Sequence, residues 1–285
     1  MPLSIEPTSA TLGATLRGVD LNALDASSWQ AILDAFHEYA LLIFTGQGLS
    51  ATEQAAFARR FGDIEVLVEN LETIPISNKG ADGALLDDDT FHMQLLRGNE
   101  GWHTDSSYMP LAAKASVLSA QVVPPAGGET EWADCRAAWD VLDAATRERI
   151  RTLNAYHSYF YSQRRLGHEV ATGQAYGFFD GPPPLRPLVK RHPVTGREAL
   201  YIGRHACDIP GLDAAESERL LDELMAFTCQ PPRTYMHRWQ PGDVVVWDNR
   251  CLLHRARPYD HRHERVMMHT RVRGEPESES ALVSA

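Results

Sequence analysis

The sequence contains few cysteines, and they lie far apart. Among its 285 residues there are four, and none has the spacing of a Cys-x-x-Cys pair: Cys135, Cys207, Cys229 and Cys251. A disulfide framework or a structural zinc site usually needs regularly or closely spaced cysteines. We therefore expect reduced thiols in a cytoplasmic protein.

Long hydrophobic runs are also missing. No stretch of 18 consecutive apolar residues occurs, so the sequence predicts no transmembrane helix and no membrane partner. The segment Met1–Glu6 has neither a basic n-region nor an apolar h-region, so we expect no secretory signal.

The chain has no excess of positive charge. Its 27 Lys and Arg residues are outnumbered by 38 Asp and Glu residues, for a net charge of −11. Nucleic-acid binding depends on basic patches that neutralise phosphates, so we expect no nucleic-acid partner. A small anionic substrate remains compatible with this charge, because a local basic pocket can form within an acidic protein.

The most informative feature that is present is a His-x-Asp motif, His103 and Asp105, followed later by His254. Two imidazoles and one carboxylate form the facial triad of non-haem Fe(II) enzymes, which leaves three coordination positions open. In an extended strand, residues i and i+2 point to the same face, so His103 and Asp105 could converge on one ion. His-x-Asp alone is a weak signal. His103 could instead be a surface histidine bonded to Asp105, and His254 a strand histidine packed beside Arg255.

A third element, Arg265, follows His254 by eleven residues. A buried guanidinium can hold the distal end of a dicarboxylate through two parallel hydrogen bonds. The alternative is a surface salt bridge between Arg265 and Glu264.

In order and spacing these residues resemble the Fe(II)/2-oxoglutarate-dependent dioxygenases of the taurine dioxygenase and 2,4-dichlorophenoxyacetate dioxygenase family. His103, Asp105 and His254 match the iron ligands of that family. Thr130 matches the threonine that contacts 2-oxoglutarate, and Arg265 matches the arginine that pairs with its C5 carboxylate. The resemblance runs from about residue 11 to 274. Segments 102–120, 133–143 and 185–211 are most similar to the phenoxypropionate dioxygenase branch.

The resemblance implies an oxidoreductase that uses Fe(2+), 2-oxoglutarate and O2. The expected substrate is a small carboxylate, most of all an aryloxyalkanoate such as a phenoxypropionate or phenoxyacetate herbicide. Hydroxylation beside the ether oxygen would cleave the substrate to a phenol and an oxo acid, with release of succinate and CO2.

Three further residues are expected to bind the substrate. Arg271 is the first choice for its carboxylate, because odd positions of this strand share a face with Arg265. His269 stands where the taurine enzyme has a sulfonate-binding arginine, so its role is left open. Asn99 matches a substrate-side asparagine of the taurine enzyme, or is a loop-turn residue.

Several alternatives stay open at this point. The same chemistry could act on a sulfonate such as taurine or on an alkyl sulfate. In another class, the three ligands could hold zinc in a metal-dependent hydrolase, or the fold could be a non-enzymatic cupin-like binder. Thr130 and Arg265 count against the hydrolase, which would not need a 2-oxoglutarate site.

For the fold, the many short strands predict a mostly β protein with flanking helices, built on a double-stranded β-helix of the jelly-roll or cupin kind. We expect one domain over residues 1–274, a disordered tail over 275–285, and a homo-oligomer. Residues 64–100 are irregular and 157–184 are rich in Tyr, Gly and Pro, so both are expected to cover the active site.

Local signals predict several elements. Ser50 and Glu53 form a capping box that opens a helix to about Phe61, and Asp134 and Asp143 are expected to cap two further helices. Other helices are expected around 29–36 and within 211–227. Strands are expected around 40–44, 117–123, 244–246, 251–253 and 266–272.

Overall fold

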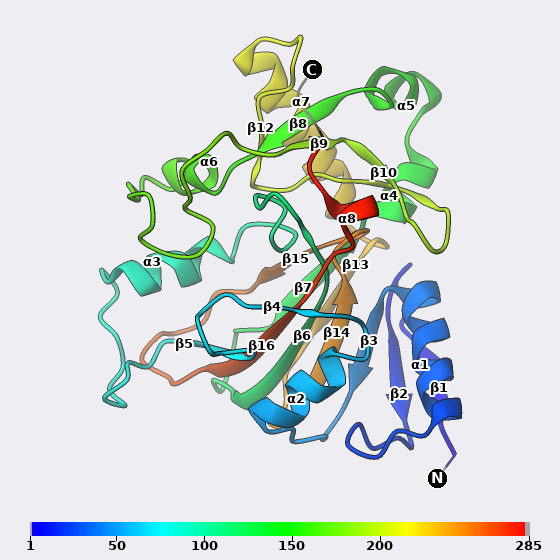
Figure 1. The fold of residues 1–285 in the computed structure, drawn as a ribbon, viewed down its shortest axis with the longest axis vertical. Helices are drawn as coiled ribbons and strands as arrows, with labels where there is room; N and C mark the ends of the chain where they lie inside the picture. The colour runs from blue at the N-terminus through cyan, green and yellow to red at the C-terminus, as the bar shows by residue number, and fades with distance from the viewer. Residues whose placement is uncertain (1, 283–285) are drawn as a thin grey trace.

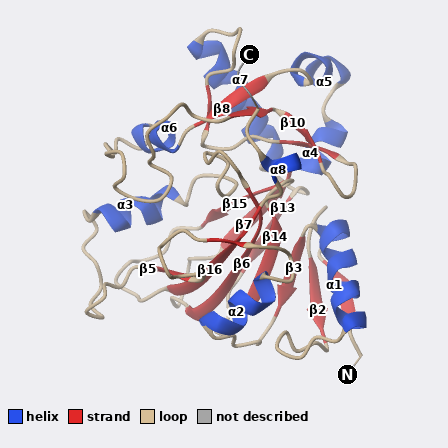
Figure 2. Ribbon diagram, viewed as in Figure 1, coloured by secondary structure: helices blue, strands red, loops and turns tan. Residues whose placement is uncertain are grey.

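The structure is a computed structural model that describes residues 2–282 of the chain. Strands occupy its middle and helices surround them (Figures 1 and 2). The largest sheet has eight strands, in the order β1-β2-β3-β14-β6-β16-β4, with β5 also paired to β16. A second sheet, in the order β13-β7-β15, lies against it. Two smaller sheets, β12-β8-β9 and β10-β11, complete the strand pairing.

The strands are β1 (Ser4–Pro7), β2 (Ala14–Arg17), β3 (Leu41–Phe44), β4 (Ile64–Glu65), β5 (Ile74–Ser77), β6 (Ala113–Val122), β7 (Thr130–Asp134), β8 (Asn154–His157), β9 (Leu185–Pro187), β10 (Val189–Arg191), β11 (Glu198–Leu200), β12 (Ala206–Cys207), β13 (Thr234–His237), β14 (Val244–Asp248), β15 (Leu252–Ala256) and β16 (Val266–Arg273). The helices are α1 (Ala26–Tyr39), α2 (Ala51–Ala58), α3 (Phe91–Gly98), α4 (Cys135–Val141), α5 (Ala144–Ile150), α6 (Tyr159–Arg164), α7 (Ala214–Thr228) and α8 (Pro276–Glu279). Among these residues, none of the helices has the length and apolar character that crossing a membrane requires.

The two faces of the large sheet pack against different partners. Side chains alternate along a strand, so Val244 and Val246 of β14 lie in a core with helices α1 and α2, through Phe36 and Phe57. The intervening Val245 points to the opposite face and belongs to a second core that includes the β13-β7-β15 sheet. The site described below lies on this second face, between the two sheets.

Helix starts follow the predicted signals. Ser50 and Glu53 make both bonds of the capping box, Asp134 caps α4, and Asp143 caps α5. Helix α2 ends at Ala58, three residues before the expected Phe61, because the chain turns there to enter β4.

Two segments differ from expectation. Residues 64–100 are not wholly irregular, since they contain β4, β5 and α3. The tail also differs from the expected disorder over the residues that are described. Helix α8 ends in the fully buried Glu279, which forms an ion pair with Lys190. The backbone of Leu282 bonds to Leu185. Residues 283–285 lie outside the described part of the chain.

Candidate functional site

One pocket between the two sheets brings together all of the residues singled out from the sequence. Its lining includes His103, Asp105, His254, Thr130, Arg265, Arg271, His269 and Asn99. They come from the segment after α3, from β7 and β15 of the small sheet, and from β16 of the large sheet and the residue that precedes it, Arg265. The remaining wall is apolar and consists of Ile76, Leu118, Trp247 and Ala256.

The two histidines and the aspartate lie close enough to share one metal ion. One ligand atom from each of His103, Asp105 and His254 lies within 4.8 Å of the others, and all three residues are buried. The backbones of His103 and His254 exchange two hydrogen bonds of 3.0 and 2.7 Å, which sets their ring centroids 4.1 Å apart. The expected extended strand holds only as far as this bridge, because the chain begins a turn at Asp105.

The surroundings of the imidazoles suit metal binding. Burial and neighbouring positive charges keep the pKa of His103 well below its usual range, and burial lowers the pKa of His254 to about 4. Both rings are therefore neutral near pH 7 and offer a lone pair. Nδ1 of His103 lies 2.8 Å from the Gly101 carbonyl, which leaves Nε2 free for a metal, the arrangement that orients ligating histidines. Nδ1 of His254 has no hydrogen-bond partner within residues 2–282.

Asp105 is held from several sides. Ser116 Oγ donates to its Oδ2 at 2.7 Å, and Arg271 Nη2 lies 2.9 Å from its Oδ1. Nε2 of His254 lies 3.7 Å from the same Oδ2, too far for a good hydrogen bond. Burial alone would raise the pKa of Asp105, but Arg271 and the nearby imidazoles lower it, so the group is a carboxylate. Two imidazoles and one carboxylate are the donor set that Fe(II) takes in a facial triad.

Arg265 is a buried cation with no carboxylate partner within the described residues. It is 6% exposed, and its Nε and Nη2 donate to the Gly128 carbonyl at 3.2 and 3.0 Å. Burial lowers its pKa to about 10, so it remains charged at neutral pH. The alternative salt bridge with Glu264 is not formed, because Glu264 pairs with Lys79 at 2.9 Å. Thr130 accepts a hydrogen bond from Trp239 Nε1 at 3.0 Å, which leaves its hydroxyl proton available to a ligand.

His269 and Arg271 both face the pocket from β16, as the strand alternation predicted. Arg271 contacts Asp105, Ser106 and Tyr108 through its two terminal nitrogens, but its Nε has no hydrogen-bond partner among the described residues. Nε2 of His269 also lacks a hydrogen-bond partner and lies 3.5 Å from Asp105 Oδ2. Asn99 ends α3 as its C-cap and lines the same pocket.

Several residues that support the site were not predicted. Ser116 and Asn249 hold Asp105, the first by the bond above and the second by accepting from its backbone N–H at 3.3 Å. Trp247 lies with its ring centroid 4.7 Å from that of His254. Trp247 and Asn249 precede His254 by seven and five residues, and this closeness to the distal histidine was the available signal. No sequence signal marks Ser116, since its contact depends on how β6 pairs in the sheet.

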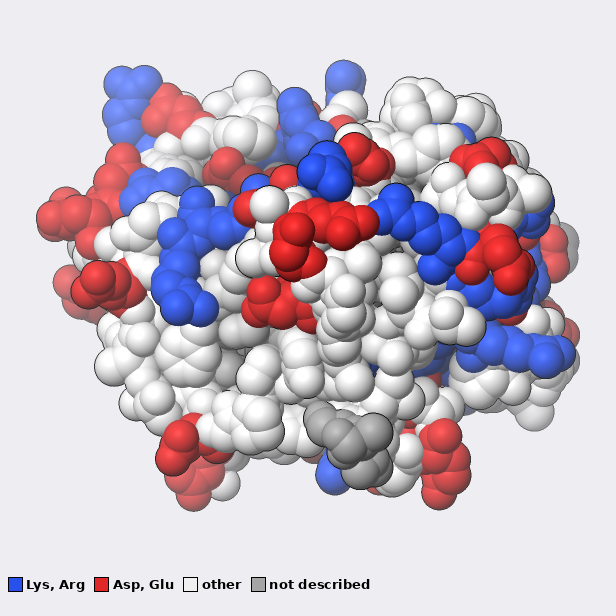
Figure 3. Space-filling view, turned by 90° about the horizontal axis from the view of Figure 1, so that it is seen from above, with Lys and Arg blue, Asp and Glu red and all other residues white. Residues whose placement is uncertain are grey.

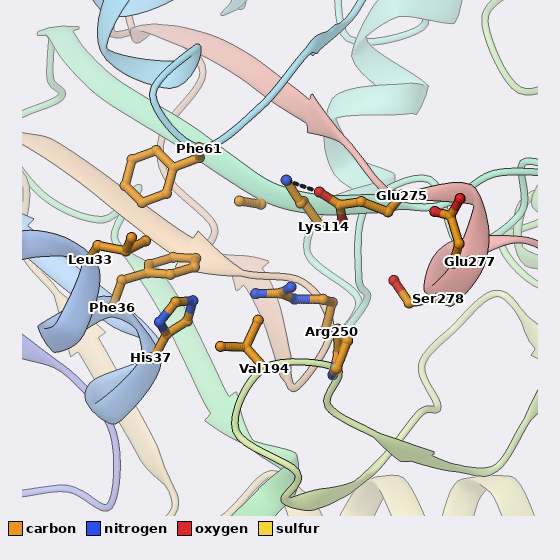
Figure 4. Close-up of a pocket in the computed structure, with 12 residues that line it drawn as sticks. Leu33, Phe36, His37, Phe61, Lys114, Val194, Arg250, Glu275, Glu277 and Ser278 are labelled. Atoms are coloured by element: carbon orange, nitrogen blue, oxygen red, sulfur yellow. Dashed lines mark hydrogen bonds and ion pairs between the residues drawn. The ribbon is translucent and has the colours of Figure 1, made fainter. Parts of the chain in front are cut away.

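A second pocket lies beside the C-terminal half of α1, and none of the residues predicted for the active site line it. Figure 4 shows Leu33, Phe36 and His37 of α1 facing Arg250 across it. Its cations already have partners, because Lys114 pairs with Glu275 and Arg250 pairs with Asp248. On the face of the molecule seen in Figure 3, basic and acidic side chains are interspersed rather than gathered into one basic patch.

Comparisons with known proteins agree with this geometry. Residues 4–271 match the family model described as "Taurine catabolism dioxygenase TauD, TfdA family". The chain is 54% identical to an (S)-phenoxypropionate/alpha-ketoglutarate-dioxygenase of Sphingobium herbicidovorans, over 98% of this chain and 97% of the relative. It is 38% identical to an alpha-ketoglutarate-dependent 2,4-dichlorophenoxyacetate dioxygenase of Cupriavidus pinatubonensis, over 91% and 94%. The crystal structure of AAD-2 in complex with Mn(II) and N-oxalylglycine superposes with a TM-score of 0.91 at 36% identity, and covers all of both chains.

Proposed function

The chain belongs to the TauD, TfdA family of dioxygenases, and from this premise we propose that it hydroxylates an aryloxypropionate or a closely related aryloxyalkanoate. It is an oxidoreductase that depends on 2-oxoglutarate and a divalent metal. The single observation that carries the proposal is one pocket that contains a His-Asp-His set, a separate buried arginine and unpaired donors on β16.

His103, Asp105 and His254 would hold Fe(2+), and Arg265 would pair with the far carboxylate of 2-oxoglutarate. Thr130 would donate a hydrogen bond to the same co-substrate. Together the metal, 2-oxoglutarate and O2 supply the oxidising chemistry, with one oxygen atom ending in succinate and the other in the prime substrate. The chain itself contributes position and charge. Buried Arg265 compensates a carboxylate that would otherwise be costly to bring out of water.

The substrate carboxylate would be bound by Nε of Arg271 and Nε2 of His269, two pocket-lining nitrogens that have no hydrogen-bond partner within residues 2–282. The aryl ring would lie against the apolar wall that Ile76 and Leu118 form, and Asn99 would contact the substrate from the end of α3. Hydroxylation at the carbon between carboxylate and ether oxygen gives a hemiketal. Its collapse transfers the hydroxyl proton to the leaving aryl oxygen and yields a phenol and pyruvate.

The remaining expectations fit this function. We propose that the two facing sheets form a double-stranded β-helix within one domain of residues 1–274, and that 64–100 and 157–184 cover the pocket. The support is that α3 and Asn99 belong to the first segment, while Tyr159 of the second stacks on Tyr108, a contact of Arg271. Four unpaired cysteines support a cytoplasmic location.

The experiment that tests the substrate class compares an aryloxypropionate with its neutral amide, with taurine and with an alkyl sulfate, by O2-dependent succinate formation. We expect the acid to be turned over far faster than the amide, because the amide leaves Arg271 and His269 without an anionic partner. Arg271→Ala should erase most of this preference and spare the KM for 2-oxoglutarate. An unchanged preference in the variant would mean that another residue binds the carboxylate. Faster turnover of taurine or the sulfate would refute the substrate class.

A further inference from the structure

Arg271 lies between two buried carboxylates, of which the mechanism uses one. Asp105 contacts its Nη2. The second is Glu65 of β4, which is the cross-strand partner of Arg271 in the antiparallel pairing of β4 with β16. Directly opposed residues on an antiparallel pair have side chains on the same face, so the two charges are neighbours. Glu65 is 8% exposed.

Each oxygen of the Glu65 carboxyl group accepts a hydrogen bond from a hydroxyl group. Ser106 Oγ donates to Oε2 at 2.8 Å, and Tyr176 Oη donates to Oε1. Burial, and then the charge of Glu65, raise the pKa of Tyr176, so the phenol stays protonated and remains a donor. Ser106 Oγ in turn accepts from Arg271 Nη1 at 3.2 Å. Glu65 is thereby linked to Arg271 through a fixed hydroxyl.

The summed charge of Asp105, Arg271 and Glu65 affects how strongly the site attracts a divalent metal ion. The formal charges of Asp105 and Arg271 alone sum to zero, so Arg271 weakens the attraction of Asp105 for a dication. With Glu65 included, the sum is −1. Resting on the metal centre proposed above, we propose that Glu65 is a positioning residue that offsets Arg271 and so lets Asp105 keep a net negative charge for the metal.

The same contacts connect the metal centre to the segment 157–184. Tyr176 belongs to that segment and reaches Glu65 directly. Glu65 therefore links this covering segment to the ion pair that holds Asp105.

The test measures metal affinity alone, without 2-oxoglutarate or a prime substrate. Apo-protein is titrated with Mn(II), and free Mn(II) is followed by electron paramagnetic resonance. Glu65→Gln should weaken binding on the order of tenfold, since it removes one charge from a buried site. Arg271→Gln should tighten binding by a similar factor. The double variant restores a sum of −1 and should return to within about threefold of wild type.

The control is Glu69→Gln. Glu69 is an exposed residue of segment 64–100, to which Glu65 also belongs, so the Mn(II) affinity of this variant should stay within about twofold of wild type. Circular dichroism checks that each variant is folded. Wild-type affinity in folded Glu65→Gln, or failure of the double variant to recover, would overturn the charge-balancing role. If Glu65→Gln does not fold, Arg271→Gln decides, because unchanged or weaker binding there contradicts the charge argument. Absence of Mn(II) binding by the wild-type protein would instead refute the metal centre itself.

Discussion

Two buried aspartates, Asp105 and Asp248, are surrounded by similar residue types, yet the two regions differ in how completely their polar atoms are paired. Asp248 accepts from Nε and Nη2 of Arg250 at 2.8 and 2.6 Å, and from His192 Nε2 at 2.9 Å. Nδ1 of His192 accepts from the backbone of Val194 and Thr195. Arg250 is the side chain that reaches across the pocket in Figure 4. Both oxygens of Asp248, both ring nitrogens of His192, and Nε and Nη2 of Arg250 therefore have hydrogen-bond partners.

The cluster around Asp105 has the same ingredients and leaves some of them free. Nδ1 of His254, Nε2 of His269 and Nε of Arg271 have no hydrogen-bond partner within residues 2–282. Buried polar groups in folded proteins are nearly always paired, so several unpaired groups that line one pocket indicate a binding site. Complete hydrogen bonding therefore identifies the Asp248 cluster as a structural ion pair, whereas the unpaired polar atoms that line one pocket identify the Asp105 cluster as a binding site.

The largest expected effect comes from replacing a histidine beside Asp105, compared with replacing the histidine beside Asp248. His254→Ala, like His103→Ala, should abolish Mn(II) binding and turnover with the fold intact by circular dichroism, because a facial triad has no spare ligand. His192→Ala removes the equivalent neighbour of Asp248 and should lower thermal stability without loss of metal binding. Calorimetric titration with Mn(II) measures the metal binding, and a thermal melt measures the stability. If His254→Ala still binds the metal, or if folded His192→Ala loses metal binding, the Asp105 cluster is not the metal site as distinct from the Asp248 cluster.

The next effect is on stability. Asp248→Asn leaves Arg250 and His192 without their carboxylate in a buried position, and the free energy of unfolding should fall by about 3 kcal/mol. Urea denaturation measures the change. Asp140→Asn breaks the exposed ion pair with Arg197 and should cost less than about 1 kcal/mol. Equal losses in the two variants would mean that the Asp248 cluster is not a structural element.

The sequence predicted those parts of the site that depend on local spacing. The alternation of β16 placed His269 and Arg271 on one face, and the side-chain caps of α2, α4 and α5 lie where Ser50, Asp134 and Asp143 predicted. The His-Asp-His set could be predicted because His103 and Asp105 lie two residues apart and a family resemblance supported His254 as the third ligand.

The contacts that were not predicted depend on strand register between distant segments. The pairing of Glu65 with Arg271, and the bond from Ser116 to Asp105, exist only once β4, β6 and β16 are aligned. The tail was misjudged for a related reason. Its polar composition predicted disorder, but the buried ion pair of Glu279 with Lys190 orders it.

The effect of the co-substrate arginine is confined to one kinetic constant. Arg265→Ala should raise the KM for 2-oxoglutarate by about 30- to 1000-fold, since a charge-assisted bidentate pair contributes about 2–4 kcal/mol. The KM for the prime substrate should change much less. Arg257→Ala, with an exposed side chain nearby, should alter neither constant by more than about twofold. Steady-state kinetics with each substrate varied in turn would show the split, and an unchanged KM for 2-oxoglutarate would assign its carboxylate to another residue.

The smallest effect tests whether unpaired burial by itself marks a site. Both nitrogens of His157 are buried and have no hydrogen-bond partner within residues 2–282, but its ring stacks on Tyr201 and does not line the metal pocket. Burial lowers the pKa of His157 to about 3, against about 6.5 in the unfolded chain, so the folded state binds fewer protons in between. Its contribution to stability is therefore complete above pH 6.5 and is lost as the pH falls from there toward 3, by about 2 kcal/mol between pH 7 and pH 5.

His157→Phe should flatten this part of the curve of unfolding free energy against pH, while His263→Gln, an exposed histidine, should leave it unchanged. If His157→Phe keeps the wild-type slope, His157 does not enter the folded state as an uncharged group. If instead His157→Phe weakens Mn(II) binding, His157 affects the metal pocket, and an unpaired buried group outside a pocket can then also belong to a functional site.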